Sequence, residues 1–275
     1  MVFVVIETVY GILADSLVLL ADAGHNLSDV LSLVLAWGAF WLSQKPKTPR
    51  RTFGYRKVTI IASSVSAAIL LLALGGIAWE ALHRFNSPKA VDGLTVIIVA
   101  GIGVVVNTAT ALLFMSDQRH DLNIKGAFLH MVADAAVSFG VVIAGVVIIK
   151  TGWLVVDPII SMVIVVIIFI GTWSLLRDSF NLLIDAVPGH IDTEKVSGYI
   201  ANIAHVIAFH DLHIWALSTT ETALSVHLVV DYGIIENEFL EDIQKYLHDE
   251  FGIVHSTIQL ETYAESKMYY DADCT

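Results

Sequence analysis

Two copies of a His-x-x-x-Asp pattern stand out, one running from His25 to Asp29 and the other from His130 to Asp134. Residues four apart project from one face of a helix, so each copy can present an imidazole and a carboxylate together. Both copies lie in long apolar stretches, where an ionisable residue costs roughly 2.5–3.5 kcal/mol on insertion scales and is seldom accidental. Two imidazoles and two carboxylates would make a four-ligand shell for a tetrahedral divalent metal, zinc above all.

The composition indicates a protein that crosses a membrane several times. The chain has 275 residues, of which 56% are hydrophobic and only 15% are charged. Soluble proteins of this size are rarely so apolar. The net charge of −12 and the absence of a basic stripe argue against nucleic-acid binding. After Ile184 the chain becomes polar, acidic and rich in histidine, which predicts a transmembrane domain over 1–184 and a separate domain over 185–275.

The apolar runs predict six transmembrane helices, at 2–13, 17–42, 58–82, 94–115, 122–149 and 157–176. The first run is shorter than the roughly 20 residues that a span needs, so we expect the first helix to be truncated. The densest cluster of Lys and Arg lies between the second and third runs. By the positive-inside rule, this loop and both termini are cytoplasmic, so the polar domain also lies in the cytoplasm.

This topology brings the two His-Asp pairs to a similar depth. The second and fifth helices run antiparallel, and both aspartates, Asp29 and Asp134, lie well inside their apolar runs. The two faces can therefore meet near the middle of the membrane. The alternative is that each pair is an internal His–Asp hydrogen bond that only stabilises helix packing.

Four other polar residues stand in or beside the apolar runs. Asp22 is expected to line an exit path or to be hydrated at the membrane interface, and Glu7 and Asn107 to hydrogen-bond neighbouring helices. Asp157 precedes Pro158, which predicts a helix that starts with Asp157 as its N-cap.

The segment after Pro188-Gly189 alternates between helical and strand patterns, in the order helix, strand, strand, helix, strand: 192–204, 208–217, 223–231, 236–251 and 253–261. This αββαβ order predicts a small open-faced α+β sandwich. His210 on the first strand, His227 on the second and Glu261 at the end of the third would converge into a partial metal site if the register permits. The alternative is that they are solvated surface side chains. His213 differs in parity from His210, so we expect it on the opposite face.

Several segments resemble the cation diffusion facilitator family, and in particular zinc exporters of the bacterial cobalt–zinc–cadmium resistance type. The likeness covers nearly the whole chain and includes Ser16 to Asp29, Arg51 to Arg56, Gly126 to Asp134, Asp157 to Ser161 and His210 to Trp215.

The resemblance implies a multi-pass homodimer in the inner (plasma) membrane that exports zinc in exchange for protons. His25, Asp29, His130 and Asp134 match the family's transport site. His210, His227 and Glu261 match liganding positions in its metallochaperone-like cytoplasmic domain, where zinc is a structural ion.

Two departures from the family limit what it implies. Phe53 to Arg56 stand where some members place the histidines of an additional metal site, so we expect that site to be absent. Gln259 stands where some members have a histidine ligand, which argues against a complete two-metal cluster in the cytoplasmic domain.

The predicted function is therefore a zinc/proton antiporter and not an enzyme. The chain has no P-loop for ATP, so the proton gradient would drive transport. One alternative is a membrane-anchored sensor whose cytoplasmic domain responds to zinc. Another is an intramembrane metalloenzyme that activates water, but the chain has no H-E-x-x-H motif or general base beside the ligands.

Overall fold

The computed structural model describes residues 2–115, 122–231 and 237–262. The chain forms two compact units, one built from 1–34 and 65–175 and the other from 35–64 and 176–275. Three of the long helices therefore contribute to both units. The predicted domain boundary after residue 184 stays a prediction.

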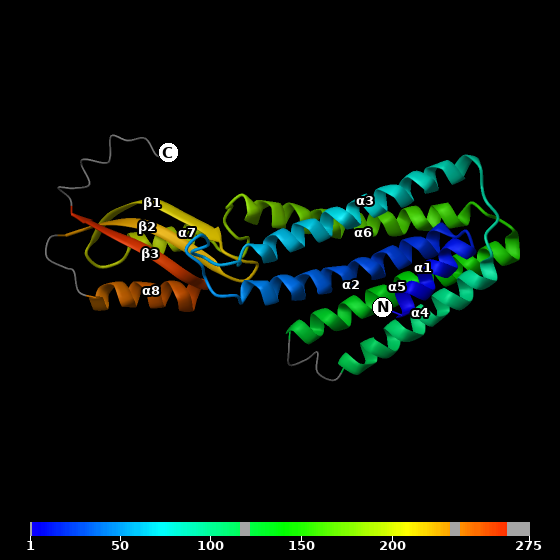
Figure 1. Ribbon diagram of the computed structural model, residues 1–275, viewed down its shortest axis with the longest axis horizontal. Helices are drawn as coiled ribbons and strands as arrows, with labels where there is room; N and C mark the ends of the chain where they lie inside the picture. The colour runs from blue at the N-terminus through cyan, green and yellow to red at the C-terminus, as the bar shows by residue number, and fades with distance from the viewer. Residues whose placement is uncertain (1, 116–121, 232–236, 263–275) are drawn as a thin grey trace. The chain divides into compact units, whose positions relative to one another are not determined.

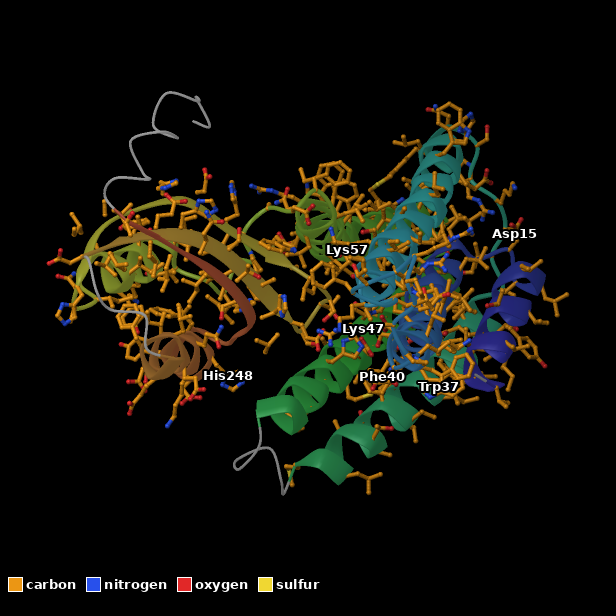
Figure 2. All side chains as sticks on the ribbon, turned by 60° about the vertical axis from the view of Figure 1, so that its left-hand side comes forward. Asp15, Trp37, Phe40, Lys47, Lys57 and His248 are labelled. Atoms are coloured by element: carbon orange, nitrogen blue, oxygen red, sulfur yellow. The ribbon has the colours of Figure 1, made fainter. Side chains whose placement is uncertain are left out.

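Six apolar helices make up the first part of the chain: α1 (Val2–Leu13), α2 (Leu17–Ser43), α3 (Val58–Asn86), α4 (Gly93–Phe114), α5 (Leu122–Thr151) and α6 (Val156–Leu183) (Figure 1). Five of them are long and apolar enough to span a membrane, and α1 is a shorter apolar helix. Their outer faces carry large exposed hydrophobic side chains, such as Trp37 at 72% and Phe40 at 61% exposure (Figure 2). Such surfaces are stable in lipid rather than in water, which agrees with the predicted fold class.

Close packing of α4 on α5 depends on two glycines. A Cβ added to Gly93 would lie 3.0 Å from the carbonyl oxygen of Gly145, and a Cβ on Gly145 would lie 3.0 Å from that of Gly93. Side chains of Ile97 and Ile149 come within 2.8 Å of the same positions. The two backbones can approach this closely only because neither residue has a side chain, as is common between helices in lipid.

The start of α2 is held by Asp157 from α6. The buried Asp157 carboxylate accepts hydrogen bonds from Ser16 Oγ (2.7 Å) and from the backbone N–H groups of Leu17 (2.9 Å) and Val18 (3.2 Å). Arg84, also buried, lies 3.9 Å from the same carboxylate. The expectation that Asp157 caps its own helix was therefore wrong: α6 begins at Val156, and Asp157 satisfies the first N–H groups of its neighbour.

The second unit contains a three-stranded sheet of β1 (Val206–Ala216), β2 (Thr222–Val230) and β3 (Ile253–Thr262), with α7 (Thr193–Ala201) and α8 (Asn237–Phe251). β2 is central, antiparallel to β1 and parallel to β3. Both helices pack on one face, where Val196 and Ile200 of α7 and Leu247 of α8 join Leu224 and Leu228 in one core. This arrangement confirms the predicted open-faced αββαβ sandwich.

Replacing Asp157 with alanine should lower the free energy of unfolding by about 2 kcal/mol, because it leaves buried N–H and hydroxyl donors at the start of α2 without an acceptor. Thermal melting of the purified full chain in detergent would measure the loss. Asp249→Ala is the matched control, since this aspartate is exposed and its one partner in the part of the chain that the structure describes is the adjacent His248, so no buried donor depends on it. Equal melting temperatures for the two variants would contradict the capping role.

Candidate metal sites

The two His-Asp pairs meet across α2 and α5 in the first unit. His25 Nε2 lies 3.1 Å from Asp134 Oδ1, and His130 Nε2 lies 3.2 Å from Asp29 Oδ2. Each histidine thus contacts the aspartate of the other helix, and this reciprocal pattern requires the two helices to run antiparallel. The structure brings all four predicted residues together.

Three of the four side chains, those of His25, Asp29 and Asp134, lie close enough together to share one ion. Within each helix, the His25 Nε2–Asp29 Oδ2 distance is 3.8 Å and the His130 Nε2–Asp134 Oδ2 distance is 3.6 Å. Zinc bonds of about 2.0 Å at tetrahedral angles separate ligand atoms by about 3.3 Å. Ligand atoms of His25, Asp29 and Asp134 lie within 4.8 Å of one another, whereas His130 falls outside this group, so a tetrahedral ion would require the His130 side chain to move inward. Without an ion, His25 Nε2 hydrogen-bonds Asp134 Oδ1 across the two helices.

Exposure within the site runs in one direction. The Asp134 and His25 side chains are 4% and 18% exposed, whereas those of Asp29 and His130 are 34% and 45% exposed. The more exposed pair, Asp29 and His130, lies nearer the C-terminal end of α2 and the N-terminal end of α5.

Asp157 and the Gly93–Gly145 contact help to position these ligands. Asp157 fixes where α2 begins, two turns before His25, and the glycine contact holds α5 against α4. Two separate contacts, neither of which involves a ligand, thus support the two helices that carry the site.

A second cluster lies on the sheet face that the helices leave open. His210 on β1 pairs in register with His227 on β2, and His227 pairs with Gln259 on β3. Glu261 bridges the two histidines, with Oε2 3.1 Å from His210 Nε2 and Oε1 2.9 Å from His227 Nδ1. Gln259 Nε2 donates to Glu261 Oε1 at 2.8 Å. The register therefore permits the convergence that the sequence left open, although the role as ligands stays a prediction.

A β-bulge changes the face of His213. The register shifts between His210 and His213, and Asp211 in the bulge has a φ of +51°. His213 pairs with Ser225, which shares a face with His227, so His210 and His213 also share a face. The prediction of opposite faces was wrong because the bulge adds one residue to β1 and restores the parity.

Asp211 joins the cluster as a further candidate ligand that the sequence reasoning missed. A ligand atom of Asp211 lies within 4.8 Å of those of His210 and His227. In a regular strand, Asp211 would lie on the face of the sheet opposite to His210, because successive side chains alternate between the two faces. The useful signal would have been an aspartate inside a strand, because this residue type tolerates the left-handed conformation that the bulge requires.

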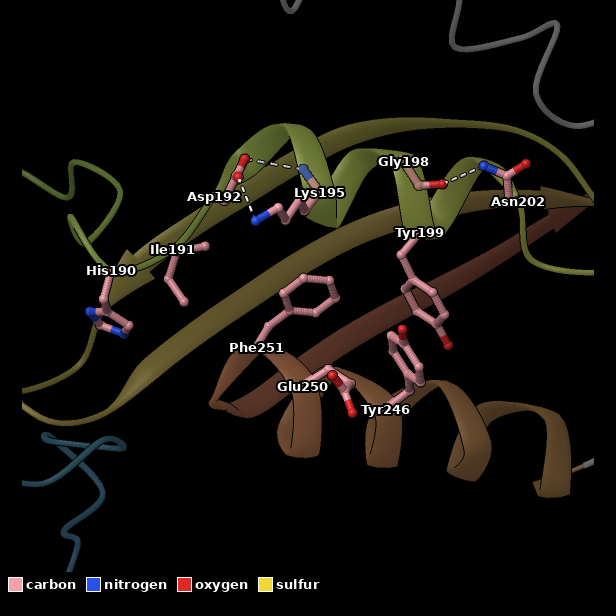
Figure 3. Close-up of a pocket in the computed structure, with 10 residues that line it drawn as sticks. All are labelled: His190, Ile191, Asp192, Lys195, Gly198, Tyr199, Asn202, Tyr246, Glu250 and Phe251. Atoms are coloured by element: carbon pink, nitrogen blue, oxygen red, sulfur yellow. Dashed lines mark hydrogen bonds and ion pairs between the residues drawn. The ribbon is translucent and has the colours of Figure 1, made fainter.

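A surface cavity of about 660 Å³ lies elsewhere in the second unit, between α7 and α8 (Figure 3). Tyr199 and Tyr246 stack across it with ring centroids 4.0 Å apart. Asp192 accepts hydrogen bonds from the backbone N–H groups of Lys195 and Glu194, which lower the pKa of its carboxyl, and so it caps the start of α7. Asp192 and Asn202, two of the polar residues that line the cavity, hydrogen-bond the backbone at the two ends of α7.

His227→Ala should reduce the zinc bound by the full chain by about one ion, because it removes one imidazole from the sheet cluster. Isothermal titration with zinc chloride would count the ions. His213→Ala is the control, since His213 lies on the same face but outside the cluster. An unchanged zinc count in His227→Ala would exclude this cluster as a metal site.

Comparisons with known proteins cover both parts of the chain. Residues 1–184 match the cation efflux transmembrane domain, and residues 188–263 match the cytoplasmic domain of cation efflux proteins. A cadmium, cobalt and zinc/H(+)-K(+) antiporter of Bacillus subtilis is 36% identical over 96% of this chain and 86% of its own length. The zinc transporter ZitB of Yersinia pestis is 38% identical over 94% of this chain and 83% of its own.

The metal cation efflux system protein CzcD of Cupriavidus metallidurans is 36% identical over 94% of this chain and 82% of its own length. The solved metal-bound C-terminal domain of the CzcD transporter is 39% identical, with a TM-score of 0.25, and covers 26% of this chain and 99% of that domain. The matching models cover most of the chain, so it belongs to the cation efflux family of membrane transporters, as the resemblance implied, and not to an enzyme family.

Proposed function

We propose that this chain exports zinc from the cytoplasm in exchange for protons, with His25, Asp29, His130 and Asp134 as the transport site. The observation that carries the proposal is the reciprocal contact between the two His-Asp pairs, at 3.1 and 3.2 Å. The names of the relatives, a zinc transporter and a zinc/H(+)-K(+) antiporter, support both the cargo and the proton.

The ligand types explain why zinc and protons would exchange. Zinc binds neutral imidazole and ionised carboxylate, so a loaded site cannot also hold protons on its ligand atoms. Imidazole titrates close to neutral pH, so modest differences in pH between the two sides change its occupancy. Zinc would bind on the side of lower proton concentration and be displaced by protons on the other.

The exposure gradient indicates which side the site faces. The exposed residues, Asp29 and His130, lie toward the end of α2 that leads into the basic connection between α2 and α3. Under the positive-inside rule this end is cytoplasmic. The described conformation would therefore load zinc from the cytoplasm, and the outward-facing state would require α2 and α5 to open at their other ends.

The sheet cluster has a separate role in this proposal. His210, His227 and Glu261 would hold a structural zinc ion in the cytoplasmic domain, and a second copy of the chain would be the partner that this domain binds. The protein would then work as a homodimer in the inner (plasma) membrane, with both termini in the cytoplasm. The match to the family's cytoplasmic domain supports this assignment.

A membrane-anchored zinc sensor is the second candidate, because the sheet cluster alone would suffice for it. The four intramembrane residues favour transport, since a sensor would have no use for a ligand set between α2 and α5. Asp134→Ala separates the two: a transporter loses zinc flux, whereas a sensor keeps the zinc response of its cytoplasmic domain.

His25→Ala should lower zinc flux into proteoliposomes under an imposed pH gradient at least about tenfold, because it removes one of four ligands. A zinc-sensitive dye inside the vesicles would report the flux. His83→Ala is the matched control, since this histidine is exposed on α3 and hydrogen-bonds only its own helix at Trp79. Equal flux in both variants would refute the assigned site.

Collapse of the pH gradient with a protonophore should stop uphill zinc accumulation by the native chain, because no other energy source is available to it in the vesicle. The same vesicles should still equilibrate zinc down its own gradient. Continued uphill accumulation without a pH gradient would rule out proton exchange.

A further inference from the structure

Two acidic side chains lie in the helix bundle that the proposed transport site does not use. Glu7 of α1 and Asp22 of α2 are both fully buried, and Glu7 bonds Asn26, which lies one turn after Asp22 on the same face of α2, so the two carboxyl groups are neighbours. Hydration at the interface, one of the two expectations for Asp22, is therefore wrong. The expectation that Glu7 bonds a neighbouring helix is confirmed by its contacts with α2.

One oxygen of each carboxyl group has an ordinary donor. Asn26 Nδ2 donates to Glu7 Oε2 at 2.9 Å, and Ser138 Oγ on α5 donates to Asp22 Oδ2 at 2.9 Å. The remaining oxygens, Glu7 Oε1 and Asp22 Oδ1, are buried and have no donor among the described residues. The two donors thus hold the carboxyl groups in place and leave one buried oxygen on each without a donor from the described part of the chain.

Two ionised carboxylates close together at a buried position repel each other and lack solvation. A single proton held between them removes one charge and supplies the missing hydrogen bond, as in other buried carboxyl pairs. The surrounding elements offer little compensation: α4 contains no ionisable residue, and α1 contains no cation. The ionisable groups that act on Asp22 from outside the pair are His25 on α2 and Asp134 on α5.

We propose that Glu7 and Asp22 form a second proton-binding site, separate from the metal ligands, that holds one shared proton and releases it when zinc binds. This inference rests on the proposed zinc/proton exchange and adds a group that carries part of the proton traffic. With the proton bound, the pair has a net charge of −1. Release of the proton to water leaves two carboxylates and a net charge of −2.

Electrostatics links this pair to the transport site. Asp22 interacts electrostatically with His25 and Asp134. A zinc ion bound by these two residues would therefore add positive charge near the Asp22 carboxyl group. Positive charge favours the ionised form of a nearby carboxyl, so zinc loading promotes loss of the shared proton. Departure of zinc has the opposite effect, and the pair takes a proton up again. Zinc and the shared proton therefore alternate without sharing a ligand atom.

Glu7→Gln and Asp22→Asn are the test variants, because each replaces a carboxyl by an amide of the same shape. The new carbonyl oxygen still accepts from Asn26 or Ser138, and the new NH₂ group supplies the hydrogen bond that the proton supplied. Proteoliposomes with one dye for zinc and one for pH would give the protons moved per zinc ion. The ratio should fall by about one in each variant. It should fall no further in the double variant, because the two residues share a single proton.

Glu194→Gln is the matched control, since it removes an exposed carboxylate of α7 and should leave the ratio unchanged. A ratio that stays at the native value in both test variants, even with slower zinc flux, would show that the pair has only a packing role and would overturn the proposal. If one of the two variants fails to fold, the other still tests whether the ratio of protons to zinc falls by about one.

Infrared titration of the purified full chain separates this inference from the proposed function. A shared proton gives a protonated-carboxyl band that weakens on addition of zinc chloride and is missing in Glu7→Gln. Absence of the band from the native chain would overturn the proposal even if zinc is transported. If the native chain and His25→Ala give equal zinc flux but the band is present, the proposed antiport is refuted and the shared proton is still supported.

Discussion

A polar side chain inside the helix bundle has no water to bond with, so its partner must lie on another helix, and this requirement governs how the first unit is held together. Asp157 of α6 receives the first N–H groups of α2. His25 and Asp134 join α2 to α5. Glu7 joins α1 to α2 through Asn26. Each contact replaces hydration that the interior cannot supply, and together they link helices whose apolar faces alone would pack in many ways.

The same requirement applies to the proposed transport site between α2 and α5. The largely buried side chains of His25 and Asp134 would be destabilising as isolated groups, but here each histidine of the site lies within 3.2 Å of a carboxylate on the other helix. These contacts partner the ring Nε2 atoms of both histidines, while His25 Nδ1 is buried without a partner among the described residues. In the proposed function, zinc would replace the contacts with metal bonds.

The sheet cluster of the second unit follows a different principle. There the backbone register does the positioning: three strands present His210, His227 and Gln259 in one row across the open face, and Glu261 reaches two of them. The bulge at Asp211 bends β1 and brings an additional carboxylate close to the row. Rigid strands on a packed core hold such a group more accurately than loops would.

Apolar periodicity and the paired His-x-x-x-Asp spacing were enough to predict the helices, the αββαβ order and the faces on which the His and Asp side chains lie, because these features depend on local chemistry and on the repeat of a helix or strand. Tertiary structure decided the rest. Asp157 caps α2 rather than its own helix, the bulge at Asp211 puts His213 on the same face as His210, and Glu7 meets Asp22. Each of these depends on the partner that folding brings within reach, and a buried polar group takes whichever partner removes its desolvation cost, however far away it lies in the sequence.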